Sequence, residues 1–278
     1  MFGFSRKAAI AAAVLAVGAT SVTTRAADSK YSFAAGVDFS SHYVSFGTDV
    51  WGGGANFSPF SAKSTAFAHG TLTCAFTPEL SGFINVWTDL NDNVDSGIGG
   101  PLQEVDLNTG LNYTWNKFTF GATYAYWQFG GGAEKAIELS ASYNDADTLI
   151  KGFAFNPSFL AHYRYDVTGD LNEKDACVLQ VGISPSFTFL SDTEYPVTLS
   201  IPAAFGYFTD AYAGGDGAGI GYADIGVTAS VPLAFIPKEY GSWTASANLT
   251  FYNTPSNDQP ANPRENFLVS TLSIGMAF

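Results

Sequence analysis

The chain has 278 residues, of which 46% are hydrophobic and 15% aromatic but only 13% charged, about half the charged share of an average soluble domain. The longest uncharged apolar stretch, Ala8 to Val22, is shorter than the roughly 20 residues that a membrane-spanning helix needs, which excludes a helical membrane bundle. A formal net charge of −13 argues against nucleic acid as a partner.

The first 26 residues have the pattern of an export signal. Arg6 and Lys7 form a basic start, residues 8–19 are apolar, and Thr24-Arg25-Ala26 is a small-x-small cleavage site. An uncleaved anchor helix is the alternative, and the short apolar stretch disfavours it. The sequence therefore predicts a signal peptide over 1–26 and one exported domain over 27–278.

From Tyr31 onward, apolar and polar side chains alternate with a period of two, the pattern of strands with two different faces. The clearest strand is 104–115, where Val105, Leu107 and Leu111 share one face and Glu104 and Asp106 the other. The composition, with 29 Gly, 24 Phe and 14 Tyr, also favours strands joined by glycine-rich turns. Eleven further strands are expected, with apolar residues spanning 33–39, 72–76, 84–90, 118–126, 137–143, 153–165, 177–189, 197–205, 225–233, 243–251 and 268–278.

The connections between these strands alternate between long and short. Long connections are expected at 47–63, 91–101, 167–176, 209–219 and 254–264, and short ones at 77–81, 116–117, 144–147, 190–196 and 237–241, with the short link 130–133 as the exception. Short periplasmic turns and long extracellular loops are typical of outer-membrane barrels. A soluble β-sandwich also alternates in hydrophobicity, but it gives no reason for this pattern of connections.

Aromatic residues on the apolar face gather at the strand ends, as in the two girdles of a membrane barrel. The terminal Phe278 is similar to the signal by which the outer-membrane assembly machinery recognises its substrates. The sequence thus predicts an all-β protein, a transmembrane antiparallel up-and-down β-barrel of about 12 strands in the lipid bilayer of the cell outer membrane. The girdle candidates are Tyr113, Trp115, Phe118, Phe187, Phe189 and Trp243 beside short turns and Tyr43, Tyr126, Tyr163 and Tyr165 beside long loops.

The polar face carries more acids than bases, and it is the candidate lumen wall. Buried charges are costly unless water or a partner reaches them, so this excess predicts a wet, acid-lined interior. The alternative is that several acids form a solubilising rim at the barrel mouths. The expected lumen-lining residues are Asp38, Asp89, Glu104, Asp106, Asn108, Glu138, His162, Arg164 and Asp224, and Asp166 has the same parity.

The sequence contains no clear catalytic, metal or cofactor motif. A barrel lipase needs a catalytic serine beside a histidine that a third group orients. The sequence has three histidines, and His162, which lies on the same polar strand face as Arg164, is expected to be a hydrated wall residue and not a catalyst. The loop Asp92 to Gly97 lacks the glycine and glutamate of a calcium loop. We therefore expect no enzyme activity, metal or cofactor, and an outer-membrane phospholipase is a minor alternative.

Several motifs resemble one known family. The run Ser81-Gly82-Phe83-Ile84-Asn85-Val86-Trp87, then Glu104-Val105-Asp106-Leu107 with Gly110 and Tyr113, Tyr124-Ala125-Tyr126 and Glu138-Leu139, is similar to the TorF-type porins of Gram-negative outer membranes. The resemblance covers roughly residues 31 to 145 and implies a porin without a defined solute. The leading hypothesis is a channel for passive diffusion of small solutes or ions that prefers cations, and the alternative is a structural or adhesive barrel that acts through its loops.

Overall fold

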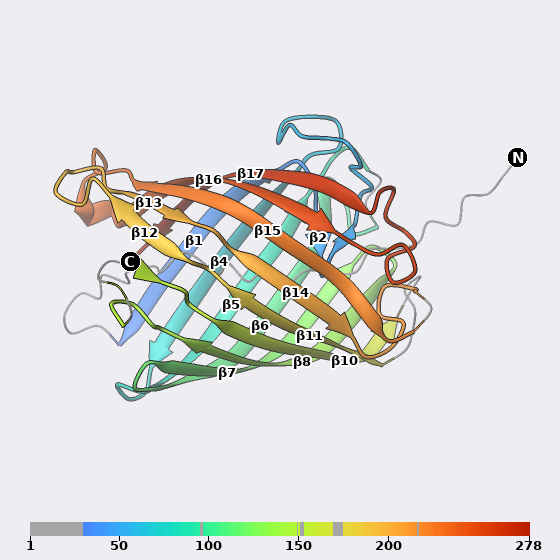
Figure 1. Cartoon of the computed structure of the whole chain (residues 1–278), viewed down its shortest axis with the longest axis horizontal. Coiled ribbons are helices and arrows are strands. Elements are labelled where there is room, and N and C mark those ends of the chain that lie inside the picture. Colours follow the sequence, from blue (N-terminus) through green and yellow to red (C-terminus); the bar gives the residue numbers. More distant parts are fainter. Residues whose placement is uncertain (1–29, 95–96, 149, 151–152, 169–174, 216) are drawn as a thin grey trace, which may run out of the picture.

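The protein is a closed barrel of antiparallel strands (Figure 1). The computed structural model describes residues 30–94, 97–148, 150, 153–168, 175–215 and 217–278, so the predicted signal peptide lies outside the described residues. Within the described part, the one helix is a single turn, η1 (Lys238–Tyr240), and no helix has the length and apolar content to cross a membrane.

Each strand of the ring pairs with its neighbours in the sequence, and β1 pairs with β17 to close it, with Ala34 opposite Ala277. Closure removes sheet edges and gives the backbone groups partners within the sheet, as a hydrocarbon environment requires. The predicted up-and-down barrel of about 12 strands is confirmed. The ring consists of β1 (Tyr31–Ser40), β4 (Thr65–Ala75), β5 (Leu80–Leu90), β6 (Leu102–Trp115), β7 (Phe118–Phe129), β8 (Gly132–Tyr143), β10 (Ser158–Thr168), β11 (Ala176–Ile183), β14 (Ala203–Phe208), β15 (Gly219–Pro232), β16 (Ser242–Asn253) and β17 (Asn266–Ala277).

The two ends of the barrel differ in their connections. Connections 41–64, 91–101, 209–218 and 254–265 leave one end, called the long-loop end, and turns 116–117, 190–196 and 233–241 leave the other, called the short-turn end. The first loop contains the small hairpin β2 (Val44–Ser45) and β3 (Thr48–Asp49). The predicted alternation of long and short connections is therefore present, except that the connection expected at 144–147 continues to residue 157 before β10 begins.

The apolar face of the strands points outward. On β6, Leu107 and Leu111 are 45% and 50% exposed on the outer wall, whereas Glu104 and Asp106 are each 2% exposed inside. Apart from Tyr43, which lies inside the barrel, the girdle candidates lie on this outer face with partly exposed rings, and Phe278 pairs with Phe33 of β1 beyond the end of β17. Their role as membrane girdles stays a prediction.

Three neighbouring strand positions are interrupted at prolines. Short segments continue the wall toward the short-turn end: β9 (Phe153–Ala154) before Pro157, β12 (Ser186–Phe189) after Pro185, and β13 (Val197–Ser200) before Pro202. The sequence predicted continuous strands over 153–165, 177–189 and 197–205, and this was wrong because proline has no N–H for the ladder. The wall stays connected because the N–H of Ile201 donates to the Pro185 carbonyl at 2.8 Å and that of Gly226 to the Pro202 carbonyl at 2.7 Å.

Candidate functional site

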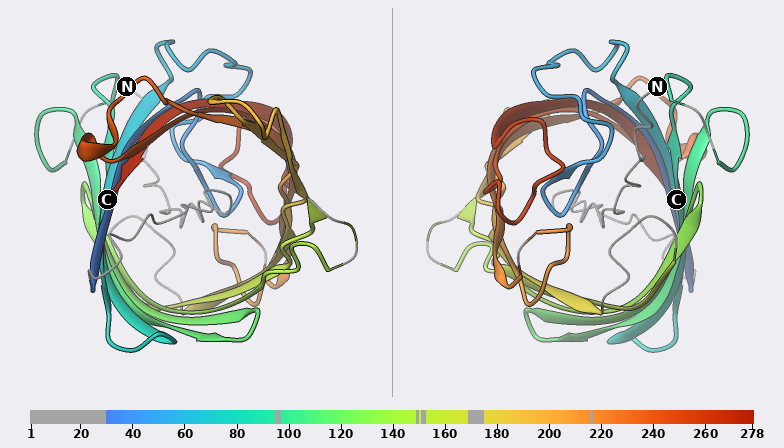
Figure 2. Two further views of the ribbon diagram at one scale, coloured as in Figure 1. Left: turned by 90° about the vertical axis from the view of Figure 1, so that its left-hand side faces the viewer. Right: turned by 90° about the vertical axis from the view of Figure 1, so that its right-hand side faces the viewer.

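Three loops at the long-loop end fold back into the barrel. Figure 2 shows blue, orange and red loop segments inside the ring of strands. Their side chains are buried there: Tyr43 and Tyr212 are fully covered, and Phe46 and Gln259 are 5% and 1% exposed. We call residues 41–50, 209–214 and 254–262 the plug.

Hydrogen bonds between two loops hold the plug together. The Gln259 side chain accepts from the Thr48 hydroxyl at 2.8 Å and donates to the Phe46 carbonyl at 2.7 Å. The Asn262 amide donates to the Gly47 carbonyl at 2.8 Å. Gly47 has a φ of +80°, a left-handed conformation that glycine adopts without strain, so the hairpin can turn tightly at this point. The first and last long loops therefore form one unit.

Beneath the plug, three carboxyl groups lie side by side on the inner wall, and we call Asp89, Glu104 and Asp106 the acid row. Asp89 of β5 is the direct cross-strand partner of Glu104 of β6, and Asp106 is two residues further along the same face. The plug hydroxyl of Tyr43 donates to Glu104 Oε2 at 2.9 Å, and the Trp51 indole donates to Asp89 Oδ2 at 2.7 Å. The wall and plug together therefore bury this row.

Among the described residues, no ion pair includes a carboxyl group of the acid row. Glu104 Oε1 and Asp106 Oδ1 are buried without a hydrogen-bond donor among the described residues. The rings of Tyr43, Phe67 and Trp87 pack together next to the row: Phe67 and Trp87 stack with centroids 4.8 Å apart, and Tyr43 meets Phe67 edge-on. The groups that donate hydrogen bonds to the row are the Tyr43 and Thr65 hydroxyls and the Trp51 indole, and all three are neutral.

A second buried cluster lies further round the wall, around His162 of β10. Glu134 Oε1 lies 2.9 Å from its Nε2 and Glu138 Oε1 lies 3.0 Å from its Nδ1, and both glutamates come from β8. Trp127 and the plug residue Phe46 cover the imidazole, each with its ring centroid 4.8 Å away. His162 is fully buried, so the expected hydrated wall residue is wrong: protein side chains, not water, surround it.

The geometry of this cluster fixes the charge of His162. A carboxylate oxygen accepts hydrogen bonds but cannot donate them, so an imidazole between two carboxylates donates from both nitrogens and is positively charged. Arg164 is the second cation, with Nη1 3.7 Å from Glu134 Oε2. Two cations thus face the two carboxylates of Glu134 and Glu138, and this cluster balances its own charge.

Arg164 also joins the wall to the plug. Its Nη2 donates to the Tyr212 carbonyl at 2.7 Å, and its guanidinium carbon lies 4.2 Å from the centre of the Tyr212 ring, a cation–π contact. Burial, together with the nearby Glu134 charge, raises the pKa of Tyr212 well above its ordinary value. Tyr212 therefore stays neutral, and an uncharged ring suits its place inside the plug.

One set of plug residues has the side chains of a hydrolase triad. Ser41 Oγ lies 2.9 Å from His42 Nδ1, and Asp49 Oδ2 lies 3.9 Å from His42 Nε2. Burial lowers the pKa of His42, and the Asp49 charge offsets only part of this. All three residues are at most 3% exposed, and Ser41 Oγ accepts the Ser270 N–H at 3.0 Å. A substrate carbonyl has no access to this serine, so the trio shapes the plug.

The other predicted lumen residues are more scattered. Asn108 accepts the Trp127 indole N–H at 3.0 Å, beside the acid row. Asp38 of β1 has its Oδ2 3.4 Å from Nε2 of His69 on β4, and Asp224 lies on β15. Neither aspartate belongs to the acid row or to the cluster around His162. Among the described residues, no group of three or more His, Cys, Asp or Glu side chains is placed to hold a metal ion.

Two sequence-based expectations need correction. Asp166 does not share the inner face, because a bulge between Arg164 and Asp166 shifts the register and pairs it with Lys135 in a 2.7 Å ion pair. The inner wall at the long-loop end is also not a hydrated polar surface, since aromatic plug and wall residues bury Glu104 and Asp106.

Sequence reasoning also missed residues that complete the site. Glu134 has the same parity as Glu138 in β8, so extending that expected strand toward its start would have placed it on the inner face. Trp127 follows Tyr126 directly in β7, so the outward position predicted for Tyr126 would have placed Trp127 on the inner face. Tyr43 and Tyr212 lie in loops without periodicity, and no sequence signal placed them inside the barrel. The girdle position expected for Tyr43 is wrong, because its side chain is fully buried.

No protein-family model and no curated protein matches the sequence. Among solved structures, the chain is similar to the COG4313 outer membrane channel from Pseudomonas putida F1, with a TM-score of 0.51, 12% identity, and coverage of 89% of this chain and 95% of that one. It is also similar to the NanC porin, with a TM-score of 0.47, 9% identity, and coverage of 88% and 98%. At such identities the first likeness shows the fold alone: this chain has the fold of an outer-membrane β-barrel.

Proposed function

We propose that the protein is an outer-membrane channel for passive diffusion of small solutes or ions, that it prefers cations, and that its plug narrows the long-loop end, which faces the outside. The observation that carries this proposal is the acid row. Glu134 and Glu138 have His162 and Arg164 as counter-charges, whereas Asp89, Glu104 and Asp106 are contacted by neutral groups.

An unbalanced row of carboxylates inside a low-dielectric wall attracts cations and repels anions. The acid row lies beneath the plug residue Tyr43, so an ion that passed between the plug and this part of the wall would come close to it. The alternative hypothesis is that these acids form a solubilising rim at the mouth of the barrel. Their burial argues against it, because a rim residue would face bulk water. Membership of the TorF-type porin family is part of the same proposal and rests on the motifs within residues 31 to 145.

Selectivity tests this proposal directly. We expect the wild-type channel in a planar bilayer under a salt gradient to show a cation-selective reversal potential. The double variant Glu104→Gln with Asp106→Asn should move that potential toward zero, because it removes two wall charges while keeping side-chain shape. The preference should also weaken at high salt, since the Debye length falls from about 10 Å at 0.1 M to about 3 Å at 1 M.

The matched control removes the same charge outside the lumen. Asp166 pairs with Lys135 on the outer face, and the exposed Asp175 accepts the Tyr163 hydroxyl. The double variant Asp166→Asn with Asp175→Asn should therefore leave the reversal potential unchanged. An anion-selective wild type, or an acid-row variant that behaves like this control, would show that the acid row lies outside the conduction path.

The proposed location has its own test. Because a closed ladder resists detergent denaturation, the refolded protein should migrate differently in detergent gels before and after boiling, and it should fractionate with the outer membrane. A protein that stays soluble in the periplasm without detergent would contradict the assignment of the apolar face to lipid.

A structural or adhesive barrel is the other reading, and no described feature favours it over a channel. The phospholipase alternative is weaker, because the Ser41, His42 and Asp49 side chains are buried. Swelling of liposomes by small solutes supports the channel, and its complete absence supports the structural reading.

A further inference from the structure

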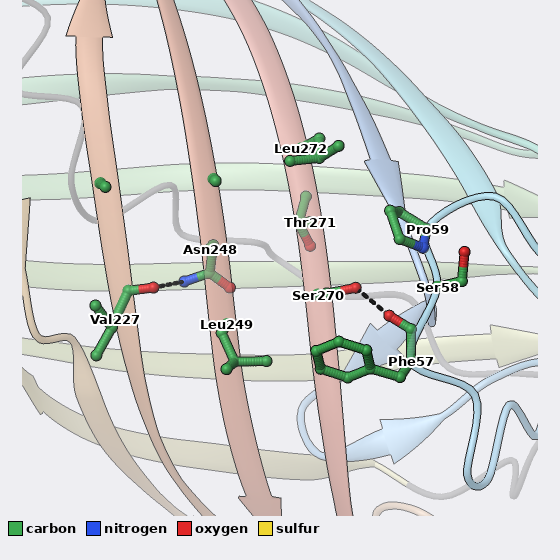
Figure 3. A pocket seen from close by; sticks show the side chains of 11 residues that line it. Phe57, Ser58, Pro59, Val227, Asn248, Leu249, Ser270, Thr271 and Leu272 are labelled. Carbon is green, nitrogen blue, oxygen red and sulfur yellow. Dashed lines mark hydrogen bonds between the residues drawn. The ribbon is translucent and has the colours of Figure 1, made fainter.

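The outer wall of the barrel carries a groove of about 570 Å³, a volume within the range of known ligand pockets of about 300 to 1,000 Å³. It lies on the outside of β15, β16 and β17, under a stretch of the first long loop (Figure 3). We call residues 55–62 of that loop the flap.

Small side chains create the depression in the wall. Ala229 of β15 lies opposite Ala247 of β16, which lies opposite Leu272 of β17, and the next outward pair along β15 and β16 is Val227 with Leu249. The two alanines are smaller than Val227, Leu249 and Leu272 beside them, so they leave space between these side chains. Val227 and Leu249 are 47% and 40% exposed on the outer face, so the groove opens to whatever surrounds the barrel.

The flap forms the remaining side of the groove, and it is fixed to the outer wall. The Ser270 hydroxyl on β17 donates to the Phe57 carbonyl at 2.5 Å. The Phe60 ring lies 5.7 Å from the ring of Phe39, which is on the outer face of β1. Asn56 donates to the Ser41 carbonyl at 2.7 Å, which ties the flap to the start of the plug.

The lining indicates a hydrocarbon occupant. None of the side chains that line the groove is charged, and their exposed surface is mainly aliphatic and aromatic. The hydroxyl of Ser270 is already bonded to the flap, and the Asn248 amide reaches the Val227 carbonyl at 3.5 Å. The groove thus offers no charged group to a lipid headgroup, and an empty apolar groove would lose its dispersion contacts.

The flap also places aromatic rings where membrane lipids meet water. Phe57 and Phe60 are 55% and 70% exposed beside the groove at the long-loop side of the outer wall. Exposed aromatic residues at this level anchor proteins at the membrane interface. The chemistry around the groove, apolar along the wall and aromatic at its cover, fits a lipid chain that enters from the surrounding leaflet.

We propose that the groove binds one acyl chain of a membrane lipid, and that the flap makes this chain exchange more slowly than the chains around the rest of the barrel. Lipid tails are as apolar as the wall, so selective retention here comes from packing against a shaped, partly covered surface. The inference rests on the membrane location in the proposed function, but it does not depend on ion conduction.

Native mass spectrometry of the full chain tests the site. The protein is refolded into vesicles of palmitoyl-oleoyl phosphatidylglycerol, extracted into detergent and weighed. We expect the wild type to retain one phosphatidylglycerol per barrel. Ala247→Trp should lose this lipid, because the indole fills the groove. Ala245→Trp is the matched control, since Ala245 lies two residues away on the same outer face of β16, opposite Val231 and Ile274, outside the groove.

Each outcome bears on the proposal. Loss in Ala247→Trp with retention in Ala245→Trp supports it. No retained lipid in the wild type, or equal retention in both variants, overturns it, as does a dimer that Ala247→Trp abolishes, because the face would then bind a second copy of the chain. A barrel that conducts cations but keeps no lipid refutes the lipid site alone, whereas a protein that stays soluble without detergent refutes the membrane location itself.

Discussion

Glu134→Ala is expected to lower the free energy of unfolding by about 3–5 kcal/mol, the usual cost of removing one partner from a buried charged pair. Glu134 is fully buried and contacts two cations, with Oε1 2.9 Å from His162 and Oε2 3.7 Å from Arg164. Its removal leaves a fully buried imidazolium with one carboxylate instead of two. The loss should also loosen the plug, because Arg164 holds Tyr212.

Urea unfolding of the barrel refolded in vesicles measures this loss, and Glu138→Ala is the comparison. Glu138 Oε1 lies 3.0 Å from Nδ1 of the same imidazole, but its side chain is 14% exposed and it forms one ion pair within the cluster, whereas Glu134 forms two. Its removal should therefore cost clearly less than that of Glu134. Equal losses of unfolding free energy would contradict the prediction, because they would show that the deeper burial and second cation of Glu134 add nothing to stability.

The barrel was predictable from the sequence because its cause is local and repeated. Each strand places successive residues on opposite faces, so Leu107 and Asp106 must lie on different faces of β6. Because the outer face of a membrane barrel is apolar, Leu107 points outward and Asp106 inward. Closure then follows from the need of the backbone for partners in hydrocarbon. The three prolines that interrupt strands, Pro157, Pro185 and Pro202, could have predicted the interruptions. They were overlooked because the alternation of apolar and polar residues continues on both sides of each proline.

The candidate site was only partly predictable, because it depends on contacts between distant segments. Asp89 and Glu104 meet because consecutive strands pair, which parity alone predicts. Tyr43 reaches Glu104 from 61 residues away through a loop that has no periodic pattern. Asp166 was misplaced because a bulge inserts one residue and moves every later side chain to the other face, and no residue type marks that bulge.

Leu107→Arg is expected to cost about 2–4 kcal/mol, because it places a charge near the middle of β6 on the face assigned to hydrocarbon. Leu111→Arg, also outward but nearer the short turn at 116–117, should cost less, since the penalty falls toward the membrane interface. Urea unfolding in vesicles gives both values. Together, the two variants measure how the environment of the outer wall changes with depth.

An inward position on the same strand provides the control. Asn108 is unsuitable, because its amide donates to Asn85 and its oxygen accepts from Trp127, so an arginine there would break two hydrogen bonds. Asn112 is a cleaner choice, because it faces inward beside the small residues Ser81 and Gly121. Asn112→Arg should therefore cost less than either Leu111→Arg or Leu107→Arg. If Leu107→Arg, Leu111→Arg and Asn112→Arg all cost the same, the two faces of β6 do not differ in environment, and the outer wall is not in lipid.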